Sequence, residues 1–218
     1  MPLCAVLFDL DDTLHDKSAT LRAAASHQYT SAELSRFGID PLDWTSRFVS
    51  FNNERIEKVE VFARLAHEFN LQQSVQNDLL HDFDTNLGKM ACSFPGAVDL
   101  LRDCHRRGLR IGVVTNGRDG FQRSKIVGMG VHNLLGSIVT SGAFGSKKPD
   151  QSIFLACLRE LGVGPQEAAF VGDDFAADME PSLALDMIAI WKSAVHSDRV
   201  AFSSDDLNEI RTYLRSVA

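Results

Sequence analysis

Residues 3–14 read LCAVLFDLDDTL and combine an apolar run with a cluster of carboxylates. The apolar part, residues 3–8, is typical of a buried strand in a parallel sheet. Asp9, Asp11 and Asp12 follow at the strand's carboxyl end, where open α/β sheets bind ligands. Repulsion between such close carboxylates raises their pKa values or recruits a cation, and Mg²⁺ prefers oxygen ligands. Taken alone, Asp11, Asp12 and Thr13 are equally typical of a turn that caps a helix.

The composition indicates a folded globular chain and excludes several classes of partner. Of the 218 residues, 44% are hydrophobic and 23% are charged, as in average folded domains. The net charge of −7 argues against binding to nucleic acid backbones, which requires basic patches. No apolar run approaches the roughly 20 residues of a membrane helix. We therefore expect neither a nucleic acid nor a membrane partner.

The amino terminus and the cysteines both bear on location. The chain enters its first strand without a basic region or a cleavage site, so we expect no secretory signal. The four cysteines, in apolar surroundings, have neither metal-like nor redox-like spacing. Buried reduced thiols are the ordinary interpretation, and a cytoplasmic location is the expectation that follows.

Residues 15–90 have the apolar periodicity of helices and contain no strand-like run. Leu21, Ala24, Ala25 and Gln28 share one helical face. Breaks near residues 37–41, 52–53, 70–71 and 87–88 divide the stretch into about four helices. We predict a helical subdomain inserted into a sheet domain, which comprises 1–14 and 91–218. Trp44, Phe48 and Phe51 are expected to form an exposed apolar patch.

The remainder of the chain alternates strands with helices, which predicts an α/β fold. Strands are expected at 109–114, 138–140, 168–171 and 187–191, with the last helix at about 205–217. This alternation is typical of a parallel sheet with helices on both faces. Asp9, Thr115 and Asp173 each follow a strand, so one edge of the sheet should collect them.

Four motifs in this order resemble those of the haloacid dehalogenase-like hydrolases, a superfamily dominated by phosphatases. They are Asp9-x-Asp11-x-Thr13, Thr115-Asn116-Gly117 after an apolar strand, Lys148-Pro149, and Gly172-Asp173 with Asp178 a few places on. The resemblance covers the sheet domain and implies a Rossmann-like fold. The helical insertion matches the family's cap in position and length.

The resemblance also implies roles for individual residues. Asp9 would be the nucleophile, Asp11 the general acid and base, and Lys148 the cation that offsets negative charge. Substrate binding would fall to Thr115 and Asn116, together with Thr13, which also steadies its turn. The metal, Mg²⁺, would be bound by Asp9, Asp173, the backbone carbonyl of Asp11 and, through water or by orienting Lys148, Asp178. Lys147 is expected to be a solvated surface lysine, and the role of Asp174 stays open.

The implied function is a Mg²⁺-dependent phosphatase that hydrolyses a small phosphorylated metabolite through an aspartyl-phosphate intermediate. A sugar phosphate or a nucleoside monophosphate is the expected substrate class. Asp11 argues against a dehalogenase or a phosphonate-cleaving enzyme, which lack this second aspartate. A phosphomutase stays open, as does a non-catalytic binding protein on the same fold. His15, next to the first motif, could face substrate, and the oligomeric state is not readable from the sequence.

Overall fold

The computed structural model describes residues 2–54 and 56–217 and divides the chain into two compact units. The first unit runs to Asp16 and resumes at Ser93, and the second comprises Lys17–Cys92. The predicted insertion, 15–90, therefore differs by two residues at each boundary. Within the described residues, no helix has the length and apolar character needed to cross a membrane.

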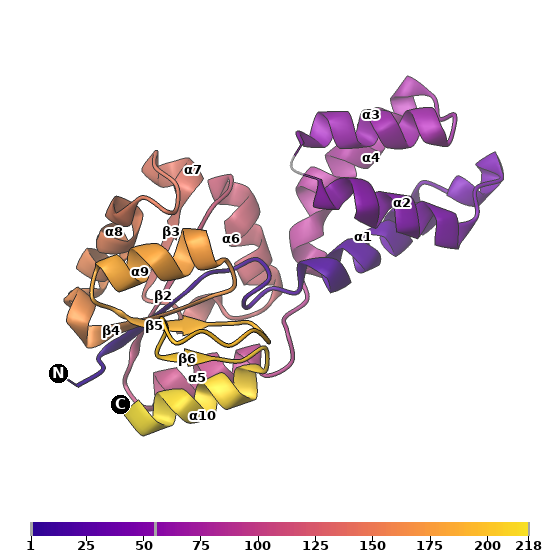
Figure 1. The fold of residues 1–218 in the computed structure, drawn as a ribbon. Helices are drawn as coiled ribbons and strands as arrows, with labels where there is room; N and C mark the ends of the chain where they lie inside the picture. The colour runs from indigo at the N-terminus through magenta and orange to yellow at the C-terminus, as the bar shows by residue number, and fades with distance from the viewer. Residues whose placement is uncertain (1, 55, 218) are drawn as a thin grey trace. The chain divides into compact units, whose positions relative to one another are not determined.

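The first unit is built on a parallel sheet with β1 at its centre (Figure 1). The order is β3-β2-β1-β4-β5-β6, and every neighbouring pair is parallel. The strands are β1 (Ala5–Phe8), β2 (Arg110–Thr115), β3 (Ser137–Thr140), β4 (Ala168–Gly172), β5 (Ile188–Trp191) and β6 (Phe202–Ser203). All four residues of β1 are fully buried, as the apolar run predicted.

Helices cover both faces of this sheet because alternate residues of β1 belong to two different cores. Val6 and Phe8 pack with α5 (Ala97–Arg106), α6 (Asp119–Gly128) and α10 (Leu207–Val217). Ala5 and Leu7 pack with α8 (Gln151–Leu161) and α9 (Glu180–Ala184). Figure 1 shows α5 and α10 on the face opposite α8 and α9. The predicted α/β fold is confirmed.

Short elements account for most differences from the predicted layout. They are α7 (Ser141–Phe144), the 3-10 turns His132–Leu134 and Pro165–Glu167, a π-helical turn (Phe175–Met179) and the two-residue β6. The side chain of Asp174 caps the π-helical turn by accepting from the backbone N–H groups of Ala176 and Ala177, both at 3.0 Å. One predicted helix is therefore a π-helical turn that leads into α9.

The second unit is helical, as predicted, and its described residues form four α-helices. These are α1 (Lys17–Ser31), α2 (Pro41–Asn53), α3 (Lys58–Glu68) and α4 (Gln73–Asn86), with 3-10 turns at Leu34–Phe37 and Leu87–Met90. Trp44, Phe48, Phe62 and Phe83 form its aromatic core. The predicted exposed patch is wrong: Trp44 and Phe48 are fully buried and Phe51 is partly buried.

The cysteines only partly match the expectation of buried thiols. All four are free. Cys104 and Cys157 are buried, and burial raises the pKa of the Cys104 thiol to about 11. Cys4 and Cys92 are only partly buried.

Candidate active site

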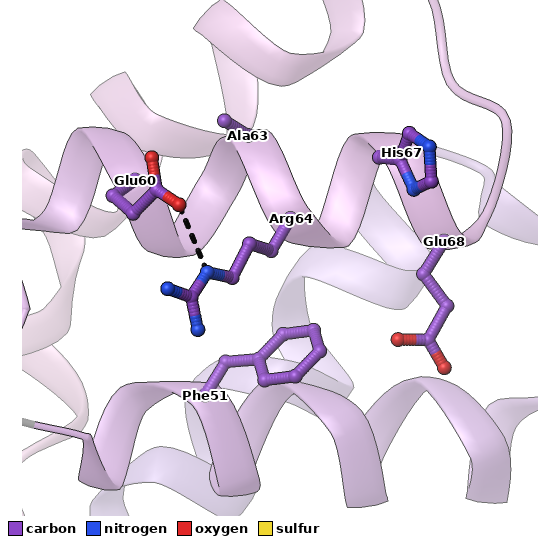
Figure 2. Close-up of a pocket in the computed structure, with 6 residues that line it drawn as sticks. All are labelled: Phe51, Glu60, Ala63, Arg64, His67 and Glu68. Atoms are coloured by element: carbon purple, nitrogen blue, oxygen red, sulfur yellow. Dashed lines mark hydrogen bonds and ion pairs between the residues drawn. The ribbon is translucent and has the colours of Figure 1, made fainter.

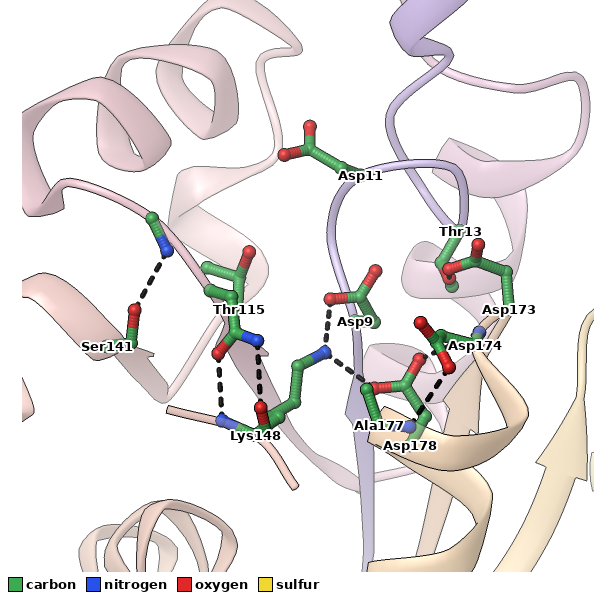
Figure 3. A network of polar contacts seen from close by, with 12 residues as sticks. Asp9, Asp11, Thr13, Thr115, Ser141, Lys148, Asp173, Asp174, Ala177 and Asp178 are labelled. Atoms are coloured by element: carbon green, nitrogen blue, oxygen red, sulfur yellow. Dashed lines mark hydrogen bonds and ion pairs between the residues drawn. The ribbon is translucent and has the colours of Figure 1, made fainter. Parts of the chain in front are cut away.

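The carboxyl ends of three adjacent strands bring the predicted motifs together. Asp9 follows β1, Thr115 ends β2 on one side, and Asp173 follows β4 on the other. Lys148 reaches the same place from the loop before α8 (Figure 3). The convergence predicted from parallel strand ends is therefore present.

Lys148 is buried and bridges two carboxylates. Its Nζ donates to Oδ1 of Asp9 at 2.5 Å and to Oδ1 of Asp178 at 2.6 Å. Burial by itself lowers the pKa of Lys148, but the charges of Asp9 and Asp178 raise it above its ordinary value. Lys148 is therefore a fixed cation between the two carboxylates.

Asp9, Asp173 and Asp178 together exceed the positive charge that Lys148 supplies. One ligand oxygen from each carboxylate lies within 4.8 Å of the other two. Burial raises the pKa of Asp9 to about 6, although Lys148 opposes the shift. Burial and neighbouring carboxylates raise the pKa of Asp173 to about 6 and that of Asp178 to about 7. Oxygen donors with excess negative charge fit a Mg²⁺ ion.

The backbone of β4 leaves room for Asp178 only because residue 172 is glycine. A Cβ placed on Gly172 would lie 2.3 Å from Oδ2 of Asp178. Oδ2 also accepts a hydrogen bond from the backbone N–H of Asp174 at 3.2 Å. The Gly-Asp pair of the fourth motif thus serves the packing of Asp178 as well as the position of Asp173.

Two residues predicted to bind substrate instead contact other site residues. Thr13 is fully buried, and its hydroxyl donates to Oδ1 of Asp173 at 3.1 Å. The Asn116 side chain bonds the backbone of Lys148, accepting from its N–H at 2.9 Å and donating to its carbonyl at 3.1 Å. In this structure Thr13 orients a carboxylate and Asn116 orients the lysine loop, and the substrate contacts expected of both residues stay predictions.

The Asp11 side chain is turned away from Asp9 (Figure 3). Lys125 Nζ donates to its two oxygens at 2.8 and 2.9 Å, and Gln122 Nε2 donates to Oδ2 at 3.0 Å. His15 Nδ1 lies 2.6 Å from Oδ1. Burial raises the pKa of Asp11, but the Lys125 charge and the His15 hydrogen bond outweigh it and lower that pKa well below its ordinary value. The Asp11 carboxylate is not among the clustered metal-type ligands, so its predicted metal contact is left to its backbone carbonyl.

The contacts of Asp11 include residues that sequence reasoning missed. The motifs give no role to Gln122 or Lys125, which the structure shows to be buried polar residues three positions apart on α6. That spacing just after Thr115-Asn116-Gly117 is the signal that could have identified them. His15 is buried and contacts Asp11, and the interpretation that it faces substrate stays a prediction.

A separate surface pocket lies within the helical unit, between α2 and α3 (Figure 2). It measures about 400 Å³ and is lined by Phe51, Glu60, Ala63, Arg64, His67 and Glu68. Arg64 already pairs with Glu60 at 2.9 Å and with Glu54 at 2.8 Å. The charge of Arg64 is thus neutralised locally, in contrast to the excess charge around Asp9.

Comparison with known proteins shows which family this chain resembles. A model described as haloacid dehalogenase-like hydrolase matches residues 4–185. A phosphoserine phosphatase from Thermus thermophilus is 37% identical over 98 residues, 45% of this chain and 39% of that protein. A glyceraldehyde 3-phosphate phosphatase from Methanothermobacter thermautotrophicus is 29% identical over 194 residues, 86% of this chain and 84% of the relative.

Solved structures agree at the level of the fold. A HAD phosphatase from Thermococcus onnurineus superposes with a TM-score of 0.65 at 24% identity, covering 98% of each chain. The matched family region contains all four motifs, from Asp9 to Asp178. The expectation of an enzyme of this family is confirmed: the chain belongs to the haloacid dehalogenase-like hydrolases.

Proposed function

We propose that this protein is a Mg²⁺-dependent phosphatase that hydrolyses a small phosphorylated metabolite through an aspartyl-phosphate on Asp9. The observation that carries the proposal is the buried Lys148 ammonium between Asp9 and Asp178, with Asp173 beside them. A nucleophilic carboxylate, a fixed cation and spare oxygen ligands are what phosphoryl transfer requires. The phosphatase names of the two relatives support the same reaction class.

In the first step, a carboxylate oxygen of Asp9 attacks phosphorus and the bond to the ester oxygen breaks. Lys148 lies 2.5 Å from Asp9 and offsets the negative charge on the carboxylate and the phosphoryl oxygens. The Thr115 hydroxyl, at the end of β2, would donate to a phosphoryl oxygen. Asp9 leaves this step as a mixed anhydride with phosphate.

Asp11 would act as general acid and then as general base. It gives a proton to the departing ester oxygen, and it then takes one from the water that attacks the phosphorus of the intermediate. The second step restores Asp9 and releases inorganic phosphate. The leaving oxygen departs in line, on the side of the phosphorus opposite Asp9, and the Asp11 side chain, held by Lys125, is turned away from Asp9.

Asp9, Asp173 and Asp178, with the backbone carbonyl of Asp11, are the groups that would hold Mg²⁺. Bound there, the ion would neutralise the excess negative charge of the site and of the phosphoryl oxygens. The raised pKa values of the three carboxyl groups support this, because carboxylates are crowded there without enough positive charge.

We assign substrate choice to the helical unit, acting as a cap. The four motifs supply chemistry that is common to the family, so substrate selectivity is expected to come from residues outside them. A sugar phosphate or a nucleoside monophosphate is the proposed substrate class. The relatives' names, phosphoserine and glyceraldehyde 3-phosphate phosphatase, also indicate small phosphorylated compounds. The four free thiols fit the cytoplasmic location expected for such an enzyme.

The test is phosphate release from sugar phosphates, nucleoside monophosphates, phosphoserine, glyceraldehyde 3-phosphate and an aryl phosphate, with Mg²⁺ or with EDTA. We expect release that requires the metal and that falls at least about a thousandfold in Asp9→Asn. Asp198→Asn is the matched control, because that side chain is 99% exposed. A wild-type protein that transfers phosphate between positions of one sugar would be a phosphomutase, and one that neither hydrolyses nor transfers would be a binding protein.

A further inference from the structure

Helix α6 presents two buried polar side chains to the loop that carries Asp11. Gln122 and Lys125 are three residues apart, so they share one face of the helix, and they are 1% and 5% exposed. Burying a lysine and a glutamine adds little to stability, because their desolvation offsets the hydrogen bonds they form. The burial of these two side chains is therefore better explained by their contacts with the candidate active site than by stability.

Lys125 is the centre of this cluster. Its Nζ donates to Oδ1 and Oδ2 of Asp11 at 2.8 and 2.9 Å, and to Oε1 of Gln122 at 2.8 Å. Nζ also lies 4.8 Å from the centre of the Phe121 ring. Charge-assisted contacts to both oxygens fix the orientation of a carboxylate more strongly than a single neutral hydrogen bond does. His15 adds a contact to Oδ1 from the other end of the same loop.

Gln122 joins this carboxylate to the second motif. Its Nε2 lies 2.7 Å from Oγ1 of Thr115, 3.0 Å from Oδ2 of Asp11 and 3.3 Å from the carbonyl of Asn116. A hydroxyl that accepts a hydrogen bond keeps its own proton to donate. The same amide thus sets the orientation of the hydroxyl at the end of β2 and of the Asp11 side chain.

We propose that Lys125, oriented by Gln122, is a positioning residue that sets where the carboxylate of Asp11 lies relative to the reacting ester. Lys125 acts through Asp11 and touches neither substrate nor metal. This inference rests on the proposed phosphatase activity, since it concerns the residue that exchanges protons with the leaving group and with water.

If Lys125 positions Asp11, its variants should show a kinetic pattern that a purely structural role would not produce. An alkoxide leaving group needs a proton from the general acid, whereas a nitrophenolate leaves readily without one. Misplacing Asp11 should therefore lower kcat/KM for an alkyl phosphate more than for an aryl phosphate. A general loss of folded protein or of phosphate binding would lower both values equally.

The experiment compares wild type, Lys125→Gln, Asp11→Asn and the double variant, all saturated with Mg²⁺. Glutamine removes the charge but keeps an amide that can donate to the carboxylate, which limits damage to folding. Arg123→Gln is the matched control, because it removes one cation from the same helix where the side chain is 45% exposed. Each variant is assayed with the best alkyl phosphate of the panel and with p-nitrophenyl phosphate, and its folding is checked by circular dichroism.

We expect Lys125→Gln to lower kcat/KM at least tenfold for the alkyl phosphate and less than threefold for the aryl phosphate. Lys125→Arg, which keeps the charge, should recover the alkyl value to within about threefold of wild type. In the Asp11→Asn background, Lys125→Gln should have no further effect. Arg123→Gln should behave as wild type.

Several results would overturn the proposal. Equal losses on both substrates, or an undiminished loss in the Asp11→Asn background, would mean that Lys125 does not act through Asp11. If Lys125→Gln does not fold, an unaltered alkyl-to-aryl ratio in Lys125→Arg and in Gln122→Met would overturn it as well. If wild type releases no phosphate at all, the proposed function itself fails, and the positioning role falls with it. An active wild type with a fully active Lys125→Gln would overturn only the present inference.

Discussion

Asp9 and Asp11 are two residues apart in the loop after β1, but their surroundings carry opposite charge. Asp9 shares one ammonium, that of Lys148, with Asp178, and Asp173 adds a third carboxylate. Asp11 is surrounded by donors, with Lys125 on both oxygens and His15 and Gln122 beside it. The carboxylates on the Asp9 side therefore outnumber the one ammonium there and attract a further cation, whereas Lys125 already balances the charge of Asp11.

This difference moves the two pKa values in opposite directions. Burial raises the pKa of Asp9 to about 6, whereas the Lys125 charge outweighs burial and lowers the pKa of Asp11. The proposed mechanism needs the reverse order, with Asp9 ionised as nucleophile and Asp11 protonated as acid. A cation bound near Asp9 lowers its pKa, and the negative charge of a bound phosphate ester raises the pKa of Asp11. Metal and substrate together would thus prepare the site for reaction.

Among the tests of the contrast between Asp9 and Asp11, the largest effect is expected from removing Lys148. Lys148→Met should lower kcat for phosphate release at least about a thousandfold, because the charge on Asp9 and the phosphoryl group loses its fixed counter-ion. Steady-state assays of phosphate release measure this. Lys147→Met is the matched control, since Lys147 is exposed, and it should stay within about twofold of wild type. Equal losses in both variants would contradict the assignment of Lys148.

The excess charge around Asp9 should also make stability depend on pH and metal. With EDTA present, the free energy of unfolding should fall by a few kcal/mol between about pH 4 and pH 7. The folded protein retains protons on Asp9, Asp173 and Asp178 up to pH 6–7, whereas the unfolded chain loses them near 3.8. The contribution of these three groups to the free energy of unfolding is therefore fully present below pH 3.8, and it is lost as the pH rises through 6 and 7.

Urea unfolding at pH 5 and pH 8, with EDTA and with Mg²⁺, measures this effect. Mg²⁺ should stabilise the protein more at pH 8, where the carboxylates are ionised and can bind it. Asp178→Asn should flatten the pH dependence in EDTA. A free energy of unfolding that rises from pH 5 to pH 8 without metal would contradict the charge balance described for this side of the loop.

A substitution at Gly172 tests the charged surroundings of Asp9 more finely, because Gly172 leaves room for Asp178 beside Lys148. Gly172→Ala should destabilise the protein by about 1–3 kcal/mol, because the new Cβ would lie 2.3 Å from the Asp178 carboxylate. It should also lower phosphate release by displacing Asp178. Thermal and urea unfolding measure the first effect. Gly120→Ala, in α6 with open space at its Cβ, should leave stability equal or higher.

The smallest effect is expected on the exposed side of α6. Arg123 pairs with Asp119 at 2.8 Å, as Lys125 pairs with Asp11, but both partners of the Arg123 pair are more than a third exposed. Arg123→Gln should change the free energy of unfolding by less than about 1 kcal/mol, since water screens exposed ion pairs. Urea unfolding in low and high salt measures it. A larger loss would show that α6 depends on its exposed ion pair.

Much of the site followed from local sequence because strand ends are local features. An apolar run followed by Asp9, or by Asp173, locates a side chain at the edge of a parallel sheet without knowledge of its neighbours. Lys148 was found through the motif resemblance. Its contact with both Asp9 and Asp178 agrees with the expectation that Asp178 orients the lysine.

The missed features depend on which face a side chain takes in three dimensions. Apolar periodicity treats polar residues as exposed, so it gives no sign that Gln122 and Lys125 lie on a buried face of α6. Trp44 and Phe48 lie on a helix whose apolar side packs inside the helical unit, and sequence alone did not show which helices cover it. The orientation of the Asp11 side chain toward Lys125 likewise depends on a partner far along the chain.

The central position of β1 also constrains the order in which the chain can fold. Ala5 pairs with Arg110 on one side and with Ala168 on the other, so β1 leaves the ribosome well before either of its partner strands. The helical unit, whose contacts lie within Lys17–Cys92, can form while β1 is still unpaired. The apolar run Ala5–Phe8 therefore lacks both neighbouring strands until β2 and β4 have been synthesised, and the loop that carries Asp9 and Asp11 cannot be completed before then.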